Sequence, residues 1–287
     1  MPKNLYINNG KVGNVYWNGA KAKKVFFNNV LVYSGALEFT YTGAYTVEGS
    51  LDGNFVVRFQ TSGTLTITGH GDTGGLYDLF AVGGGGAGNY YSASNGAGGG
   101  GGGGYTKTVK NLAISAGVGI SVAVGAGGEV VNSSTPVQGG SSTILTCSAS
   151  GGYGGANNHK GSDGGSGGGG PFEEADPSYG GGSNGSDGKG YYESGTGQGT
   201  TTAEFGEPGN PLYAGGGGGG SMYSNVNGSI GGAGGGGNGA MEGRGVRPGS
   251  PGVVNTGGGG GGGSSGTTWL DQKGVGGSGI VCIRNHR

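Results

Sequence analysis

Uninterrupted runs of glycine are the feature that most constrains how this chain can fold. Seven consecutive glycines occupy residues 98–104 and again 257–263, and shorter runs occupy 215–220 and 167–170. In all, 84 of the 287 residues are glycine, against an average usage of roughly 7%. Because glycine brings no apolar side chain to bury, a hydrophobic core has to come from other parts of the chain.

Contiguous glycine is compatible with two kinds of structure. Collagen is excluded, because it needs glycine at every third position with abundant proline, and only 8 prolines are present. A threefold extended helix, with a rise of about 3.1 Å per residue, has no internal hydrogen bonds and can bond to neighbouring copies. The alternative is a flexible glycine/serine linker. We favour a hydrogen-bonded polyglycine II bundle, because a linker does not require uninterrupted glycine.

Strand patterns lie before, between and after the glycine runs. Apolar and polar residues alternate across 37–41, 55–59 and 65–67, which is typical of half-buried antiparallel sheet. Further strand-like runs occur at 76–82, 105–109, 112–114, 120–124, 143–147 and 279–284. Almost no periodic apolar pattern lies between 148 and 278, so this stretch is predicted to be an insertion whose ends meet where the last strand joins the sheet.

Residues 1–35 are predicted to form small β-hairpins, with Asn8-Asn9, Asn18-Gly19 and Asn28-Asn29 as turns. So short a segment rarely folds alone, so we predict an attachment or oligomerisation module at 1–35, followed by a glycine-rich domain at 36–287. The module has five lysines and no acid. These lysines suit an acidic docking surface, although solubilising lysines on a solvated edge are equally consistent.

The remaining residues carry a net charge of −6, with acids concentrated in residues 151–213. Such a surface repels the phosphates of nucleic acid, so no nucleic-acid partner is expected. No apolar stretch approaches the length of a membrane span, and the first residues contain no apolar signal segment. We therefore expect that the protein is made in the cytoplasm and does not insert into a membrane.

The sequence contains no convincing catalytic, cofactor or metal motif, so we expect neither an enzyme nor a cofactor. Matches to G-x-G-x-x-G arise by chance at this glycine content. Asp72-Thr73-Gly74 resembles an aspartic-protease triplet but occurs once, and the three histidines lie far from one another and from the cysteines. Cys147 and Cys282 lie in strand-like runs, where buried free thiols are favoured over a disulfide.

The order of glycine runs and strand signals resembles the glycine-rich domain of bacteriophage tail-fibre and tail-tip proteins. A similar order occurs in the glycine-rich region of anaplastic lymphoma kinase. The segments that carry the resemblance are the glycine runs, Tyr105–Thr108, Ile120–Gly128, Gly139–Ser142 and Gly276–Val281. The resemblance implies an all-β fold over about 36–287, a jelly-roll-like antiparallel β-sandwich with an inserted polyglycine II helix bundle, mainly at 148–278.

Aromatic and acidic residues interrupt the glycine runs and are the candidate receptor-binding set, because rings stack on sugar faces and carboxylates accept hydroxyl hydrogen bonds. The alternative for any one ring is a cap on the bundle. The candidate set is Tyr90, Tyr91, Phe172, Glu173, Glu174, Asp176, Tyr179, Tyr191, Tyr192, Glu193, Phe205, Tyr213 and Tyr223.

The resulting functional hypothesis is a phage virion protein that attaches to a bacterial surface polysaccharide or outer protein. Residues 1–35 would bind other tail or virion proteins, and a homo-oligomer, with a trimer favoured, is expected. The alternative is a purely structural virion component, such as a tail-tip plug or head decoration. An ice-binding polyglycine protein accounts for neither the strand patterns nor the basic N-terminus.

Overall fold

The computed structural model contains β-strands and two short 3-10 helices, η1 and η3, and no α-helix among its described residues. Those residues are 35–89, 97–129, 137–155, 161–170, 202–221, 228–240, 249–263 and 274–286, together with the backbone of six short strands before residue 35. The all-β prediction is confirmed over this part of the chain.

The six N-terminal strands form three antiparallel pairs, each in a two-stranded sheet of its own. They are β1 (Tyr6–Ile7), β2 (Gly10–Lys11), β3 (Tyr16–Trp17), β4 (Ala20–Lys21), β5 (Lys24–Phe27) and β6 (Val30–Ser34). Their innermost pairs, Ile7 with Gly10, Trp17 with Ala20 and Phe27 with Val30, lie on either side of the predicted turns. The hairpin prediction is therefore confirmed, and attachment through this segment stays a prediction.

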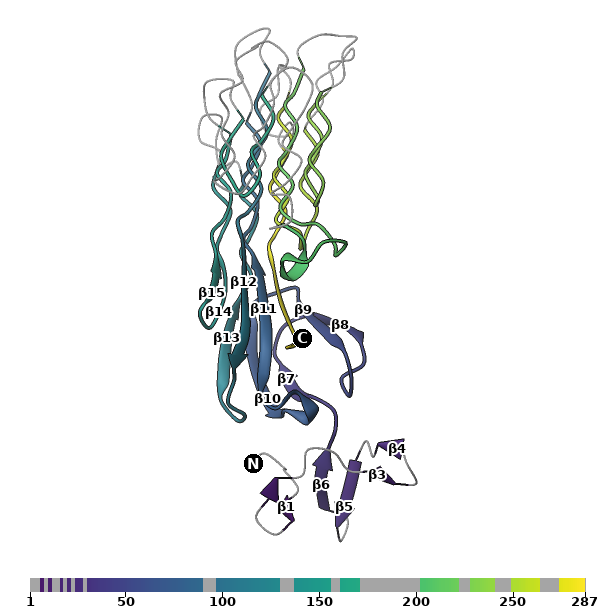
Figure 1. Ribbon diagram of the computed structural model, residues 1–287. Coiled ribbons are helices and arrows are strands. Elements are labelled where there is room, and N and C mark those ends of the chain that lie inside the picture. Colours follow the sequence, from purple (N-terminus) through teal and green to yellow (C-terminus); the bar gives the residue numbers. More distant parts are fainter. Residues whose placement is uncertain are drawn as a thin grey trace. The chain divides into compact units, whose positions relative to one another are not determined.

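The other strands form two five-stranded antiparallel sheets (Figure 1). The first has the order β15-β14-β13-β10-β7 and the second β12-β11-β16-β9-β8. The strands are β7 (Glu38–Tyr41), β8 (Tyr45–Gly49), β9 (Phe55–Phe59), β10 (Gly63–Gly69), β11 (Leu76–Val82), β12 (Thr106–Ala113), β13 (Gly119–Ala123), β14 (Ser142–Ile144), β15 (Cys147–Ala149) and β16 (Ile280–Asn285). β16 lies between β11 and β9, which confirms the predicted return of the last strand.

The chain divides by contacts into two compact units. Unit 1 comprises Met1–Leu79, Val109–Val122 and Cys282–Arg287, and unit 2 comprises Phe80–Thr108 and Ala123–Val281. The predicted boundary at residue 35 does not coincide with this division, and it stays a prediction about how residues 1–35 are used.

The core of unit 1 follows the alternation read from the sequence. In β9 the side chains of Phe55, Val57 and Phe59 are buried, and those between them are half-buried. The ring of Tyr41, on β7, lies 4.5 Å from the ring of Phe59, on β9. Because β7 and β9 belong to different sheets, the two sheets share an apolar layer here. Cys282 is buried and forms no disulfide, as favoured from the sequence.

One strand prediction needs correction. Residues 143–147 were expected to form a single strand, but a turn separates β14 from β15 at residues 145–146. Leu145 adopts a left-handed conformation, with φ 51°, and is 49% exposed. Ile144 pairs directly with Cys147, so the apolar run folds back on itself. The Cys147 thiol is buried and free, and burial raises its pKa to about 11.

In unit 2 the glycine-rich segments run alongside one another and exchange backbone hydrogen bonds (Figure 1). We call these segments the glycine lattice; its members are residues 83–89, 97–105, 124–129, 137–141, 150–155, 161–170, 213–221, 228–240, 249–263 and 274–279. Figure 1 shows them as extended chains and not as a sheet of labelled strands. Hydrogen bonding between segments thus provides backbone partners within the described part of the predicted insertion.

The backbone N–H donors of two lattice segments follow a repeat of three residues. In the segment 97–105, the N–H groups of Gly98, Gly101 and Gly104 all donate to the 257–263 segment, each at 2.8 Å. Gly100 and Gly103 donate to residues 169 and 166, while Gly102 and Tyr105 donate to residues 153 and 150. The segment 83–89 shows the same repeat. The N–H groups of residues 83, 84 and 85 donate to residues 105, 140 and 277, and those of the next three residues donate to the same three segments in the same order. Each of these two segments therefore donates hydrogen bonds to three neighbouring segments in turn.

The packing of the lattice leaves no room for a side chain at many of its glycines. A Cβ atom placed on Gly101 would overlap the carbonyl oxygen of Gly86, and one placed on Gly217 would overlap that of Gly260. These obstacles are backbone atoms, which cannot rotate away as a side chain can. The runs are uninterrupted because any other residue would force neighbouring segments apart.

We therefore expect Gly101→Ala to destabilise unit 2 by about 3 kcal/mol, the upper end of the usual cost of overpacking. The matched control is Gly53→Ala in unit 1, where the nearest heavy atom to the added Cβ is the Ser50 carbonyl oxygen at 3.8 Å. That variant should stay within about 1 kcal/mol of the parent. Urea unfolding of both variants measures the difference, and equal midpoints would contradict close packing at Gly101.

Candidate functional site

Several lattice segments end together, and their last residues form the candidate site. Asn89 donates from its N–H to the Gly99 carbonyl and accepts from the Gly263 N–H, at 2.8 and 2.9 Å. Gly98 donates to Gly263 at 2.8 Å, and Ala240 donates to Gly262 at 2.8 Å. We call this place the Asn89 end of the lattice. It is held by backbone hydrogen bonds between segments far apart in the sequence.

The predicted receptor-binding residues are placed in the sequence next to this end. Residues 90–96 are flanked in the sequence by Asn89 and Ala97, and residues 222–227 by Ser221 and Gly228. These four flanking residues belong to the lattice. Residues 171–201 follow Gly170, which contacts Gly219. Eleven members of the predicted set lie outside the described residues: Tyr90, Tyr91, Phe172, Glu173, Glu174, Asp176, Tyr179, Tyr191, Tyr192, Glu193 and Tyr223.

The remaining two members, Phe205 and Tyr213, are buried in unit 2 and are not available as a binding surface. Their exposed fractions are 1% and 6%. Both rings pack on Phe80, at centroid distances of 5.8 and 5.5 Å. Phe205 lies in η3 (Glu204–Gly206) with φ 57°. This left-handed conformation was not predicted from the sequence. In the structure, these two rings serve packing within unit 2.

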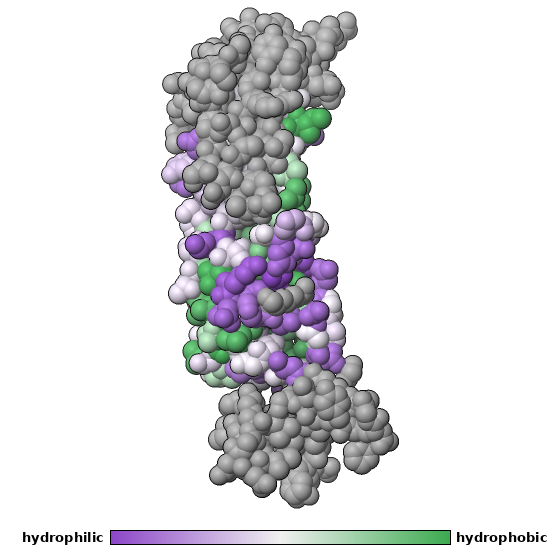
Figure 2. All heavy atoms as spheres, in the orientation of Figure 1, coloured by the Kyte–Doolittle hydropathy of each residue, from purple (hydrophilic) through white to green (hydrophobic). Residues whose placement is uncertain are grey.

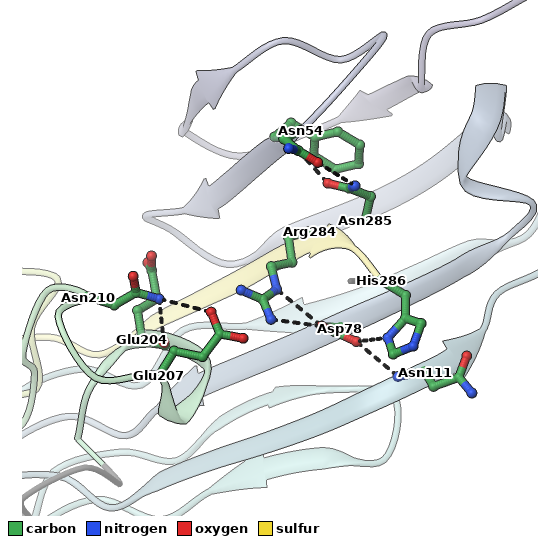
Figure 3. A network of polar contacts seen from close by, with 10 residues as sticks. Asn54, Asp78, Asn111, Glu204, Glu207, Asn210, Arg284, Asn285 and His286 are labelled. Atoms are coloured by element: carbon green, nitrogen blue, oxygen red, sulfur yellow. Dashed lines mark hydrogen bonds and ion pairs between the residues drawn. The ribbon is translucent and has the colours of Figure 1, made fainter.

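A short polar network holds this turn in place (Figure 3). The Tyr213 hydroxyl donates to the carboxylate of Glu204, Oε1, at 3.1 Å. The side-chain amide of Asn210 donates to the Glu204 carbonyl at 2.9 Å and to Glu207 Oε2 at 3.4 Å. The Glu204 side chain is only 2% exposed, and the bond from the Tyr213 hydroxyl replaces a contact that water would otherwise make with it. The acidic residue here serves the fold of the turn.

A second network, in unit 1, surrounds the buried carboxylate of Asp78 (Figure 3). The Nε and Nη2 groups of Arg284 both donate to Oδ2, at 3.1 and 3.0 Å. Oδ1 accepts from the backbone N–H of Asn111 at 3.0 Å and lies 2.7 Å from Nδ1 of His286. Asp78 is 0% and Arg284 is 1% exposed. The network joins β11, β12 and β16 with the residue after β16.

Burial taken alone raises the pKa of the Asp78 carboxyl. The hydrogen bonds from Asn111 and His286, together with the bonds and the positive charge of Arg284, outweigh burial. The net pKa therefore lies below the ordinary aspartate value. A carboxylate that is ionised and fully bonded in the core acts as a fixed anchor and not as a proton donor near neutral pH.

Sequence reasoning missed this network, although a signal was present. Asp78 and Arg284 are single charges of opposite sign within two apolar strands that were both assigned to the sheet. An unpaired charge is costly in a core. Two single charges of opposite sign in neighbouring buried strands are therefore expected to form an ion pair.

A small pocket of about 120 Å³ lies beside this network in unit 1. It is lined by Gly35, Leu51, Asp52, Gly53, Asp72, Thr73, Asn285 and His286. The Thr73 hydroxyl donates to the His70 carbonyl at 2.8 Å, and η1 (Gly71–Thr73) carries Asp72. In the described part of the chain, no three His, Cys, Asp or Glu side chains are grouped to hold a metal ion.

The surface of the described residues carries scattered apolar side chains. In unit 2, Ile230, Val253 and Val254 are 75%, 53% and 70% exposed. Figure 2 shows that apolar residues on the visible face form separate areas among hydrophilic ones. Among the described residues, no helix has the length and apolar character needed to cross a membrane.

We expect Asp78→Asn to destabilise the protein by about 3–5 kcal/mol at pH 7, because it removes the charge of the carboxylate that pairs with the buried guanidinium of Arg284. The matched control is Glu48→Gln, which breaks the ion pair of Arg58 with a carboxylate side chain that is 70% exposed. An exposed pair contributes about 1 kcal/mol or less. Urea unfolding of the two variants measures both effects.

The pH dependence distinguishes loss of the charge from a packing defect. Because the folded-state pKa of Asp78 is lowered, its contribution is fully present above the unfolded value of about 4 and is lost as the pH falls through the folded value. The stability difference between parent and Asp78→Asn should therefore shrink below about pH 4. A difference that grows as the pH is lowered would contradict this account.

Comparison with known protein families identifies the family to which most of the chain is similar. A family model described as a glycine-rich domain matches residues 60–286. The comparison with curated proteins gave no match. The matched range contains strands β10 to β16, the entire glycine lattice and the Asn89 end. The chain therefore belongs to the glycine-rich domain family.

Proposed function

We propose that this protein is a bacteriophage virion protein of the tail tip or tail fibre, and that it attaches to the bacterial host surface as a receptor-binding adhesin. The observation that carries the proposal is the Asn89 end. Lattice segments distant in sequence end together there, and the sequence continues from them into stretches rich in tyrosine, glutamate and aspartate. Binding residues carried on a rigid scaffold are a common arrangement in recognition proteins.

We also infer that the glycine lattice is a polyglycine II bundle inserted into a jelly-roll-like β-sandwich. The repeat of three in the donors of residues 83–89 and 97–105 supports this inference. A threefold helix points successive N–H groups in three directions and makes no hydrogen bonds within itself. The two facing sheets of antiparallel strands support the sandwich.

The lattice suits an adhesin for an energetic reason. Ordering a residue costs about 1–2 kcal/mol of conformational entropy, and glycine loses more than other residues. Because the glycine segments are ordered when the protein folds, the segments that follow them in the sequence are held at their ends. These segments therefore lose less conformational entropy on binding a receptor. Rings with neighbouring carboxylates then suit a polysaccharide or the outer surface of a protein.

The remaining parts of the proposal concern assembly. The lysine-rich hairpins of residues 1–35 attach the protein to other tail or virion proteins, and the protein acts in the virion after synthesis in the host cytoplasm. The five lysines without an acid in this segment support docking on an acidic partner.

A specific observation favours one alternative, a purely structural virion component. Phe205 and Tyr213 are buried against Phe80, so some interruptions of the glycine runs serve packing. If the other interruptions did the same, the protein would contribute shape and stiffness to the particle without contacting a receptor.

The test compares binding of purified, fluorescently labelled protein to a panel of bacterial strains by flow cytometry. In the test variant, the aromatic and acidic residues between 172 and 193 are replaced by serine and glycine. Binding to the strains that bind the parent protein should fall at least about tenfold, because the loss of two or more ring contacts is worth over 1.4 kcal/mol.

The matched control is Tyr153→Ser, which removes a ring that is 50% exposed on the lattice but lies outside the candidate set. It should bind as the parent does, and both variants should retain the parental unfolding midpoint. Equal binding by parent and test variant would reject the assignment of these residues. No binding to any strain by the parent protein would favour the structural alternative.

A further inference from the structure

Strand β8 (Tyr45–Gly49), in unit 1, is the terminal strand of its sheet, and all five of its residues are exposed. It pairs with β9 in a regular antiparallel register, from Tyr45 opposite Phe59 to Gly49 opposite Phe55. A terminal strand has one set of backbone groups directed at its neighbour and another set directed outward.

The hydrogen bonds on either side of β8 show which residues face outward. The Gln60 N–H donates to the Ala44 carbonyl, and the Ser50 N–H donates to the Asn54 carbonyl, both at 2.9 Å. Because bonded pairs alternate along an antiparallel ladder, Thr46 and Glu48 bond to β9. The backbone groups of Tyr45 and Val47 are therefore directed toward the open edge.

The same two residues carry apolar side chains on the core-facing side of the sheet. Tyr45 and Val47 lie opposite Phe59 and Val57, which are 0% exposed, yet they are themselves 43% and 41% exposed. The Tyr45 ring meets that of Phe39 edge-on at 5.2 Å, so it belongs to the apolar layer. The core layer continues beneath β8 without being covered at the edge.

The edge lacks the features that usually prevent strand pairing. Native sheets protect edges with lysine, proline or a β-bulge, and the pairing of β7 with β10 has an irregularity between Ile67 and Gly69. β8 contains neither lysine nor proline, and its pairing with β9 is regular. Its one charge, on Glu48, is already paired with Arg58 at 2.6 Å.

We propose that β8 pairs with β8 of a second copy of this chain, antiparallel, about a twofold axis through Val47. In this register Val47 lies opposite Val47, Tyr45 opposite Gly49, and Thr46 opposite Glu48. A ring opposite glycine covers backbone that would otherwise stay exposed, and no like charges face each other. Gly49 ends the strand with a φ of 81°, so the central hydrogen bonds are those of the Val47 pair.

The neighbouring registers fit less well. An axis through Glu48 places the two glutamates directly opposite, where like charges repel. An axis through Thr46 leaves Glu48 opposite Ala44, outside the strand, and shortens the overlap. The strand sequence therefore selects the register centred on Val47.

A second copy is also a better occupant than the N-terminal hairpins of the same chain. The described strands β1 to β6 are each paired in two-stranded sheets, and none belongs to the sheet of β8. An isologous contact of one strand buries less than the roughly 1,200–2,000 Å² of a stable interface, so the dimer depends on protein concentration. A twofold contact is distinct from the trimer favoured from the sequence.

The most direct test is disulfide cross-linking of Val47→Cys with copper phenanthroline as oxidant. Directly opposite residues of a bonded pair have Cα atoms about 5.5 Å apart, within the range of a disulfide. The control is Thr46→Cys, whose counterpart in the copy is about 7–8 Å away on the diagonal. Val47→Cys should form covalent dimer at least tenfold faster than Thr46→Cys. The parent protein gives the background, because Cys147 and Cys282 are buried.

A second variant, Val47→Pro, removes an outward N–H without removing a bond to β9, and proline is tolerated at such an edge position. In sedimentation equilibrium, the mass of the parent protein should rise toward that of a dimer with concentration, while that of Val47→Pro stays at the monomer. The proposal is overturned by equal cross-linking rates at positions 46 and 47, by a parent protein that is monomeric throughout, or by a trimer unaffected by Val47→Pro.

Discussion

The structure depends on one requirement, that the backbone N–H and C=O groups buried in the glycine lattice must find hydrogen-bond partners, most of them in other segments. A glycine run has no side chains with which to drive its own burial, and extended chains make no internal hydrogen bonds. The bonds of about 2.8–2.9 Å between segments 97–105, 257–263 and 83–89 meet this requirement. The close approach that makes these bonds possible also leaves no space for a Cβ atom at glycines such as Gly101 and Gly217.

This requirement explains how the rest of the chain is organised. Since the lattice contributes little apolar surface, the core of unit 1 comes from alternating strands such as β9 and β10. The last strand, β16, lies inside its sheet and carries Arg284, whose buried charge is matched by Asp78. The lattice segments end together at Asn89, where the sequence changes from glycine to aromatic and acidic residues.

Much of the fold could be predicted because the relevant signals are local. The hairpin turns, the alternation in residues 55–59 and the return of residues 280–283 to the sheet all follow from short patterns. The break at Leu145 and the inward turn at Phe205 could not be predicted, because both depend on left-handed conformations that residues other than glycine rarely adopt. The burial of Phe205 and Tyr213 likewise depends on Phe80, more than 120 residues earlier in the sequence.

The account as a whole depends on the glycine lattice being an ordered, hydrogen-bonded structure. Native-state amide hydrogen exchange measures this directly, on peptides that cover residues 97–105 and 257–263, with residues 55–59 of β9 as the reference. The account predicts protection of the lattice amides comparable to that of β9, because both sets are buried and bonded. Exchange of the lattice amides at the rate of an unstructured glycine chain would contradict it.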